Sequence, residues 1–276
     1  MNKTKNKYCD NFLGWALSER NLSWSGYRKV RGQVCKRIKR RIEELGLEGY
    51  SHYRQYLEEN AEEWKVFDRM ARITISRFFR DRAVWHSLGE TLLPLIVEKS
   101  LKEERKTRCW SAGSASGEEP YSLAILWKNR IQPRFPDAIP EIVATDADCH
   151  MIKRAENGCY SLGSLKELPE EWIRDAFTTE ESAYCLKDSY KEMVRFYPQD
   201  IREEMPGGKF DLVFCKNLVS MYFKKELAVS VFSKMIRKMR KGALLILGNH
   251  EQFPLDEIKE ISPFDKNLNI YFKNRA

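Results

Sequence analysis

Apolar residues near the N-terminus recur at helical spacing. Between residues 28 and 45 they fall at Val30, Val34, Ile38, Ile42 and Leu45, separated by four, four, four and three positions. That spacing puts all five on one face of a helix. The stretch LGLEGY supplies two glycines for a turn, and helical sequence continues after it. We therefore predict an all-helical N-terminal domain over residues 1–85.

Downstream of residue 107, short apolar runs alternate with amphipathic stretches. TRCWSAG, EIVATD, EMVRFYPQD, KFDLVFCKN and ALLILG read as strands, and helical segments such as EEPYSLAILWKNR separate them. This alternation predicts a mostly parallel sheet with helices on both faces, over residues 86–276. Ligands of such sheets bind beyond the carboxyl ends of the strands. Those ends are Gly113, Asp146, Asp200 and Cys215–Asn217.

The composition fits a globular chain. Of 276 residues, 42% are hydrophobic and 32% charged, and no apolar run approaches the ~20 residues of a membrane span. The start MNKTKNKYCDNF lacks the apolar core of a signal peptide, so we expect a cytoplasmic protein without membrane insertion. Seven widely spaced cysteines without a CxxC pair favour reduced, mostly buried thiols. The four histidines show no ligand spacing, and we expect no metal.

The net positive charge belongs to one segment. The chain carries +8, and residues 28–41 (RKVRGQVCKRIKRR) hold eight Lys/Arg and no acid, so the remainder is neutral overall. Such a basic helix predicts an acidic partner surface. The candidate contacts are Lys36, Arg37, Arg40 and Arg41.

A glycine-containing loop follows the first predicted strand, in CWSAGSASGEEPYSLAI. A P-loop would need Lys after Gly117, but Glu118 and Glu119 follow, and a nucleophile elbow would need Ser where Ala115 stands. A dinucleotide loop would offer its helix start to a phosphate, whereas two acids occupy this one. The ligand is therefore expected to be neutral or cationic here. S-adenosylmethionine, with its sulfonium and α-ammonium groups and no phosphate, fits, and Asp146 is positioned to accept hydrogen bonds from its ribose.

Longer strings around this loop resemble a known family. WSAGSASGEEPYSLAI, preceded by TISRFFRD and followed by ATDADCHMIKRAENGCYSLGSLKELP, is similar to the CheR-type chemoreceptor glutamate methyltransferases. The resemblance extends over nearly the whole chain, from LGLEGYSHYRQYL to FDLVFCKNLVSMYF. It implies an α/β class I S-adenosylmethionine methyltransferase fold, Rossmann-like, with a mostly parallel seven-stranded sheet and a small β-rich insertion at about 158–195. It also implies methyl transfer from S-adenosylmethionine to receptor glutamates, with S-adenosylhomocysteine as the product.

The resemblance implies roles for individual residues as well. Arg80 and Tyr222 match the pair that orients the substrate side chain, and the basic segment 28–41 matches the element that docks on the cytoplasmic helical domain of chemoreceptors. The insertion lacks glycine from 164 to 206, which disfavours the tail-peptide binding of some family members. The residues that match cofactor contacts are Thr74, Ser76, Arg80, Ala112, Gly113, Glu118, Asp146, Asp200, Ile201, Lys216 and Asn217.

A glutamate acceptor simplifies the chemistry. Its carboxylate is ionised at neutral pH and needs no general base. Catalysis would then rest on alignment and on removal of water, with Arg80 holding one carboxylate oxygen.

Two alternatives stay open. One is another S-adenosylmethionine methyltransferase, acting on a small molecule or nucleic acid, although CKNLVSMYF lacks the proline pair common in enzymes that methylate base amino groups. The other is a non-catalytic cofactor-binding signalling module, because Lys216 stands where the family usually has Arg and the stretch to Tyr222 is one residue longer. We expect no nucleic-acid partner and a monomer.

Overall fold

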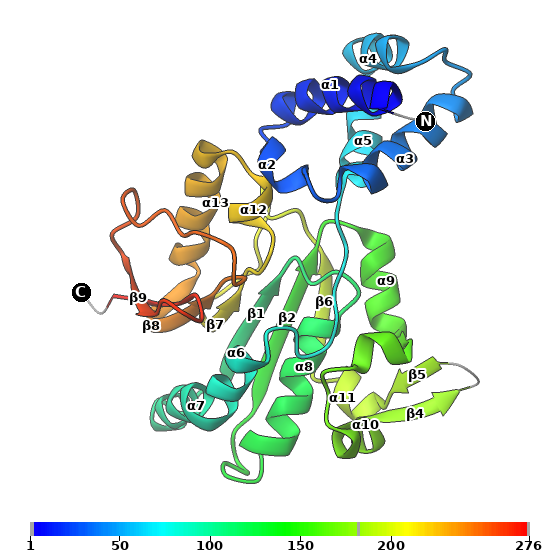
Figure 1. Cartoon of the computed structure of the whole chain (residues 1–276). Coiled ribbons are helices and arrows are strands. Elements are labelled where there is room, and N and C mark those ends of the chain that lie inside the picture. The colour runs from blue at the N-terminus through cyan, green and yellow to red at the C-terminus, as the bar shows by residue number, and fades with distance from the viewer. Residues whose placement is uncertain (1–2, 181–182, 275–276) are drawn as a thin grey trace. The chain divides into compact units, whose positions relative to one another are not determined.

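The computed structural model describes residues 3–180 and 183–274, which divide into two units (Figure 1). The helical unit contains the chain up to Ile73 together with 218–228, and the larger unit contains 74–217 and the chain from Val229. The sequence predicted a domain boundary after residue 85, whereas the two units of the structure divide after Ile73. Residues 74–85 pack with the larger unit, and a distant segment joins the helical unit.

The helical unit contains α1 (Lys3–Glu19), α2 (Trp24–Tyr27), α3 (Arg31–Glu44), α4 (Tyr50–Glu59), α5 (Glu63–Ala71) and α12 (Val219–Tyr222). The predicted apolar face is confirmed for Val34, Ile38 and Ile42, which are buried on α3, whereas Val30 and Leu45 flank the helix and are half-buried. The Phe12 ring lies 5.5 Å from Tyr53 and 6.2 Å from Phe67 between centroids, so aromatic side chains fill the core. No helix in the described ranges is long and apolar enough to span a membrane.

The larger unit is built on a seven-stranded sheet. Its strands are β1 (Thr107–Ala112), β2 (Pro140–Asp146), β6 (Val194–Pro198), β7 (Phe210–Phe214), β8 (Met239–Ile246), β9 (Ile261–Asp265) and β10 (Ile270–Lys273). Their spatial order is β6-β2-β1-β7-β8-β10-β9. The first five run parallel, and β10 pairs antiparallel with β8 and β9, which confirms the predicted mostly parallel sheet.

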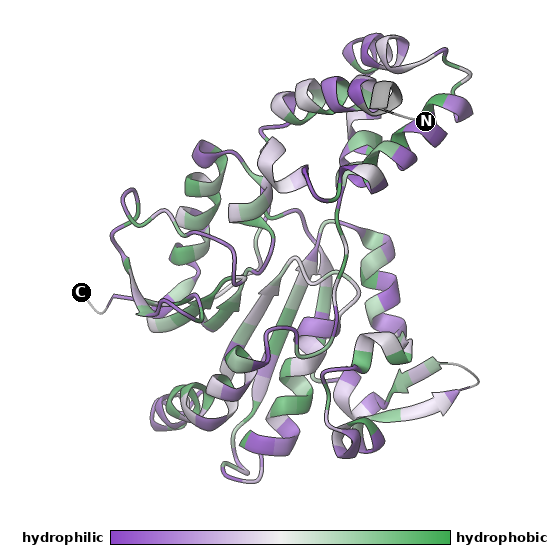
Figure 2. Ribbon diagram, viewed as in Figure 1, coloured by the Kyte–Doolittle hydropathy of each residue, from purple (hydrophilic) through white to green (hydrophobic). Residues whose placement is uncertain are grey.

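Helices connect and cover these strands. They are α6 (Arg82–Ser87), η1 (Leu88–Leu92), α7 (Leu93–Lys102), α8 (Glu118–Leu126), η2 (Trp127–Ile131), α9 (Cys149–Asn157) and α13 (Lys225–Arg237). Figure 2 shows α9 and α13 with both apolar and polar stretches, as expected of helices with one face on a sheet. Helix α9 ends at Gly158, whose φ of 69° is the left-handed conformation that glycine adopts readily.

The predicted insertion forms a small second sheet. It contains β3 (Cys159–Tyr160), η3 (Leu162–Leu165), α10 (Glu170–Ala176), β4 (Phe177–Glu180), β5 (Ala183–Leu186) and α11 (Asp188–Lys191). The order β3-β5-β4 is antiparallel throughout. This sheet is separate from the seven-stranded one (Figure 1).

The cysteines correct one prediction. Four of the seven form disulfides, Cys9–Cys35 and Cys159–Cys185, so the expectation of reduced thiols is wrong for these. Cys109, Cys149 and Cys215 form no disulfide within the described residues. Both pairs are 26 positions apart, and only helix packing (α1 on α3) or strand pairing (β3 on β5) brings them together, so the spacing gave no signal.

Candidate active site

Four adjacent parallel strands, β6, β2, β1 and β7, end at the same edge of the large sheet. Predicted residues therefore gather there. They are Ala112 at the end of β1 and Gly113 after it, Asp146 at the end of β2, Asp200 and Ile201 after β6, and Lys216 and Asn217 after β7. Parallel topology alone brings these distant segments together.

The loop after β1 is fixed by the acid that ends β2. The Asp146 carboxylate accepts the backbone N–H of Ala115 at 2.9 Å and that of Asp148 at 2.9 Å. Gly117 has a φ of +92°, and a Cβ there would lie 2.9 Å from the Ala155 Cβ. The loop thus needs glycine at 117, both for its backbone conformation and for its contact with α9.

Glu118 begins α8 and is 3% exposed. The Ser116 hydroxyl donates to its two carboxylate oxygens at 3.0 and 3.1 Å, and the Ser76 side chain is a further partner. Burial raises the pKa of Glu118, partly offset by its own backbone N–H, by the two serines and by Arg154. A buried carboxylate with these properties favours a neighbouring cation.

Glu119 is a second acid at the same helix start, and it is half-buried. The Ser111 hydroxyl donates to its Oε1 at 2.7 Å. Burial raises the pKa of Glu119, and the positive charge of Lys216 partly offsets this. Two acids therefore stand at this helix start, and the expectation that the ligand is neutral or cationic here stays a prediction.

Glu118 should make stability depend on pH. Because its folded-state pKa lies above the ordinary 4.5, its stabilising contribution is complete below 4.5 and is lost as pH rises through the folded pKa. We expect Glu118→Gln to raise the free energy of unfolding of the cofactor-free protein at pH 8 but not at pH 4, and to weaken S-adenosylmethionine binding about tenfold. Urea denaturation at pH values from 4 to 8 measures the free energy of unfolding, and titration calorimetry measures the affinity for S-adenosylmethionine.

Glu156→Gln is the control, because Glu156 is an exposed acid on α9. If both variants show the same change in stability with pH, the burial of Glu118 is not its source.

Arg80 is held by hydrogen bonds of both its side chain and its backbone carbonyl. Its guanidinium donates to the carbonyl of Ile75 at 3.3 Å and to Asn217 Oδ1 at 3.4 Å. Its own carbonyl accepts the Trp85 indole N–H at 2.8 Å and Lys216 Nζ at 3.1 Å. The segment before α6 is thereby fastened to the end of β7.

Lys216 also forms a buried ion pair that the sequence did not predict. Its Nζ lies 2.8 Å from Asp81 Oδ2, and the two side chains are 4% and 17% exposed. Asp81 has a φ of 67°, and its Oδ1 accepts Asn249 Nδ2 at 3.0 Å. Positive φ at Phe79, Asp81 and Asn217 concentrates backbone strain in this region, as is common at functional sites.

Glu251 was missed as well. It is 4% exposed, and its Oε2 accepts the backbone N–H of Gly248 at 2.8 Å and that of Asn217. A Cβ on Gly248 would lie 2.9 Å from both Asn217 Oδ1 and Glu251 Oε2. The only signal in the sequence was that GNHE follows a predicted strand end.

The remaining predicted residues lie elsewhere or are engaged locally. The Asp200 carboxylate accepts hydrogen bonds from Arg202 Nε at 2.9 Å and from Arg202 Nη2 at 2.6 Å. Thr74 is half-buried at the start of the larger unit. Tyr222 belongs to the helical unit, where its ring lies 5.1 Å from Tyr27, and its substrate-orienting role stays a prediction.

The residues at this edge fit S-adenosylmethionine. Ser114 Oγ and Gln199 Oε1 are buried and have no hydrogen-bond partner within residues 3–180 and 183–274. Buried polar atoms in native proteins are normally satisfied, so these two offer bonds to a ligand. With the acids at 118 and 146, they supply donors and acceptors for a polar, cationic molecule.

This sheet order, the glycine loop after β1 and the acid at the end of β2 define an S-adenosylmethionine-dependent methyltransferase. A family model described as "CheR methyltransferase, SAM binding domain" matches residues 74–268. The chain therefore belongs to the CheR chemotaxis protein methyltransferase family.

Relatives named "Chemotaxis protein methyltransferase" agree with this assignment. That of Listeria monocytogenes is 32% identical over 203 residues, 74% of each chain. That of Salmonella typhimurium is 27% identical over 254 residues, 89% of this chain and 84% of the relative. That of Escherichia coli is 26% identical over 234 residues, 81% and 77% of the two chains.

Proposed function

We propose that the chain transfers a methyl group from S-adenosylmethionine to glutamate side chains of chemoreceptors by in-line displacement. The observation that carries this function is Arg80, in a family whose members are chemotaxis methyltransferases. Its guanidinium donates to the Ile75 carbonyl and to Asn217 Oδ1, and its own backbone carbonyl accepts Lys216 Nζ. A fixed guanidinium is suited to a carboxylate, which it binds through charge-assisted hydrogen bonds.

The residues around Arg80 would position the substrate without acting as a base. S-adenosylmethionine supplies a methyl group made electrophilic by its sulfonium. We assign the cofactor to Glu118, Asp146 and the loop from Gly113, and the substrate carboxylate to Arg80. Removing water from that carboxylate and aligning it account for catalysis, because an ionised carboxylate is already a nucleophile.

The receptor would dock on the basic helix α3, but only part of it is free to do so. Arg41 makes two hydrogen bonds to the Glu63 carboxylate, at 2.9 and 2.8 Å. Arg37 donates to the carbonyls of Met70 and Arg72 at 2.9 and 2.6 Å. These two arginines therefore stabilise the helical unit.

The exposed bases of α3 are better candidates for the docking surface. Lys36, Lys39 and Arg40 are exposed. Arg40 pairs loosely with Glu44 at 3.6 Å, and its side chain is 75% exposed. An exposed pair of this kind contributes little to stability, so its charge is available to a partner.

We expect Lys36→Ala combined with Arg40→Ala to weaken binding to chemoreceptor cytoplasmic fragments about tenfold, because two charges that face an acidic partner are lost. Affinity of the parent protein should fall with added salt more steeply than affinity of the variant. Titration at two salt concentrations measures both.

Lys102→Ala combined with Lys106→Ala is the matched control, since it removes the same charge from exposed positions of the larger unit. Equal losses in the two double variants would mean that net charge, and not the α3 surface, determines affinity.

The acceptor is tested with cofactor carrying a labelled methyl group. Chemoreceptor-bearing membranes are incubated with the protein and then treated with base. Volatile labelled methanol indicates a carboxyl ester and supports the proposal. Base-stable label in protein, nucleic acid or a small molecule indicates another methyltransferase, and cofactor binding without transfer indicates a non-catalytic module.

A further inference from the structure

Tyr160 connects the insertion to the cofactor loop. It lies on β3, is 4% exposed, and its hydroxyl donates to the Ser116 carbonyl at 2.7 Å. Its ring meets Phe78 edge to face at 4.9 Å between centroids, within the segment that leads to Arg80. Burial raises the pKa of Tyr160 well above its ordinary range, so the hydroxyl remains a neutral donor.

Ser116 passes this constraint on to the site. Its carbonyl is held by Tyr160, and its side chain donates to both oxygens of Glu118 at 3.0 and 3.1 Å. The next residue is Gly117, where a Cβ would lie 3.1 Å from the Tyr160 hydroxyl. The Tyr160 hydroxyl therefore packs closely against the loop backbone. By holding the Ser116 carbonyl, it fixes the position of Ser116, whose side chain orients the Glu118 carboxylate.

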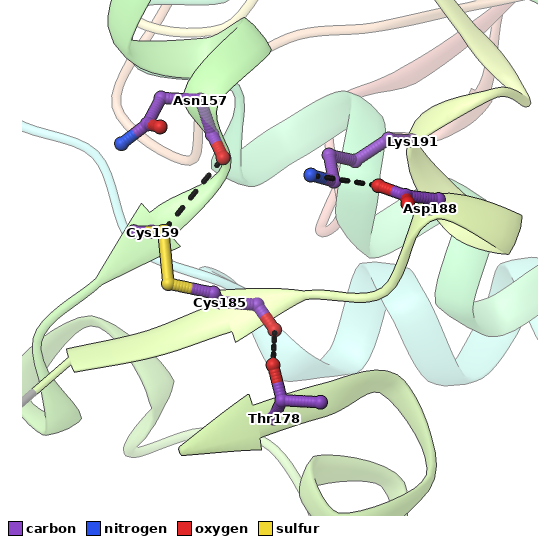
Figure 3. Close-up of a disulfide and its surroundings, with 6 residues drawn as sticks. All are labelled: Asn157, Cys159, Thr178, Cys185, Asp188 and Lys191. Atoms are coloured by element: carbon purple, nitrogen blue, oxygen red, sulfur yellow. Dashed lines mark hydrogen bonds and ion pairs between the residues drawn. A yellow bond between two sulfur atoms is a disulfide. The ribbon is translucent and has the colours of Figure 1, made fainter. Parts of the chain in front are cut away.

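The two-residue strand β3 is itself firmly held. It pairs with β5 through Cys159 opposite Cys185 and Tyr160 opposite Tyr184, and the disulfide joins the first pair (Figure 3). On one side the Gly158 carbonyl accepts the Leu186 N–H at 2.9 Å. The small sheet thus presents Tyr160 from a fixed position.

The insertion also contacts the segment before Arg80 directly. The Phe78 N–H donates to the Ser164 carbonyl at 3.0 Å, and the ring of Phe78 packs on Phe177 at 5.4 Å. The Phe79 ring lies 5.5 Å from Trp172. The insertion therefore supports both sides of the site, the cofactor loop and the segment that ends in Arg80.

We propose that Tyr160 is a positioning residue, through which the insertion fixes the cofactor loop and, by way of Ser116, the Glu118 carboxylate. In this role the insertion serves cofactor binding. The inference rests on the proposed function only in that the cofactor occupies this loop, so a binding measurement tests it whatever the methyl acceptor is.

The test is Tyr160→Phe, which removes the hydroxyl and keeps the ring. The expected result is a Kd for S-adenosylhomocysteine raised about fivefold, measured by titration calorimetry. With cofactor varied, KM for S-adenosylmethionine should rise similarly while kcat stays within about twofold, because a loop that is misplaced only before binding affects affinity and not the bound complex.

Tyr121→Phe is the matched control. Tyr121 is 1% exposed, and its hydroxyl donates to the Ala155 carbonyl at 2.9 Å, so the same bond type is lost from the same aromatic cluster. We expect the melting temperature to fall by a similar amount in both variants. Only Tyr160→Phe should bind S-adenosylhomocysteine more weakly. Equal affinity changes in the two variants, or none in Tyr160→Phe, overturn the proposal.

A variant of low stability remains informative. The rise in melting temperature with added S-adenosylhomocysteine gives the affinity even for a partly unfolded population. If Tyr160→Phe does not fold at all while Tyr121→Phe does, the hydroxyl determines the fold and the positioning role is rejected.

Discussion

Replacing Arg80 with alanine will lower the kcat for methyl transfer about 100-fold or more, while the Kd for S-adenosylhomocysteine rises less than about tenfold. The guanidinium donates hydrogen bonds to Ile75 and Asn217, which restrict its orientation and therefore that of a carboxylate bound to it. Without the guanidinium, the substrate carboxylate is still ionised, but it stays hydrated and is not aligned with the methyl group. Initial rates with a chemoreceptor fragment, together with calorimetry, separate the two quantities.

Arg77→Ala provides the control for this prediction. Arg77 lies three positions earlier in the same segment and is exposed, so its loss removes an equal charge. We expect its turnover to stay within about twofold of the parent. Near-normal turnover in Arg80→Ala would reject its role, and a Kd that changes as much as kcat would make Arg80 a cofactor contact only.

The second large effect is on stability. Lys216→Met leaves the Asp81 carboxylate buried without its cation, and we expect the free energy of unfolding to fall by about 3 kcal/mol. Turnover should fall as well, because the Arg80 carbonyl loses one of its donors. Urea denaturation and initial rates measure the two effects.

Two further variants identify the cause. Lys216→Arg keeps the charge and should retain most of the stability, although its planar fork cannot reproduce a compact ammonium in full. Adding Asp81→Asn to Lys216→Met should recover part of the loss, since the unpaired charge is gone. If the double variant is no more stable than Lys216→Met, the ion pair is not what Lys216 contributes.

The sequence predicted those site residues whose location follows from topology. Asp146, Lys216 and Asn217 stand at the ends of strands, and parallel strands bring their carboxyl ends to one edge. Glu118 could be found because charge at a helix start restricts the ligand. The alternation of apolar runs with amphipathic stretches likewise predicted five of the seven strands of the large sheet.

The partners of these residues could not be predicted in the same way. Arg80 and Lys216 are 136 positions apart, and no periodicity relates them. Asp81 pairs with Lys216, and Glu251 accepts the backbone N–H of Asn217, yet the sequence context of each resembles that of an ordinary surface acid. Strand β9 carries polar and proline residues among its apolar ones, so its pattern gave no strand signal.

The way Asp146 is held has a kinetic consequence. Its carboxylate is oriented by the N–H groups of Ala115 and Asp148 before any ribose arrives. Cofactor binding therefore costs little conformational entropy at Asp146, since the carboxylate already has the orientation in which it accepts hydrogen bonds. Association of the cofactor should follow a single exponential whose rate rises linearly with concentration, without the plateau that a slow ordering step of the loop would impose.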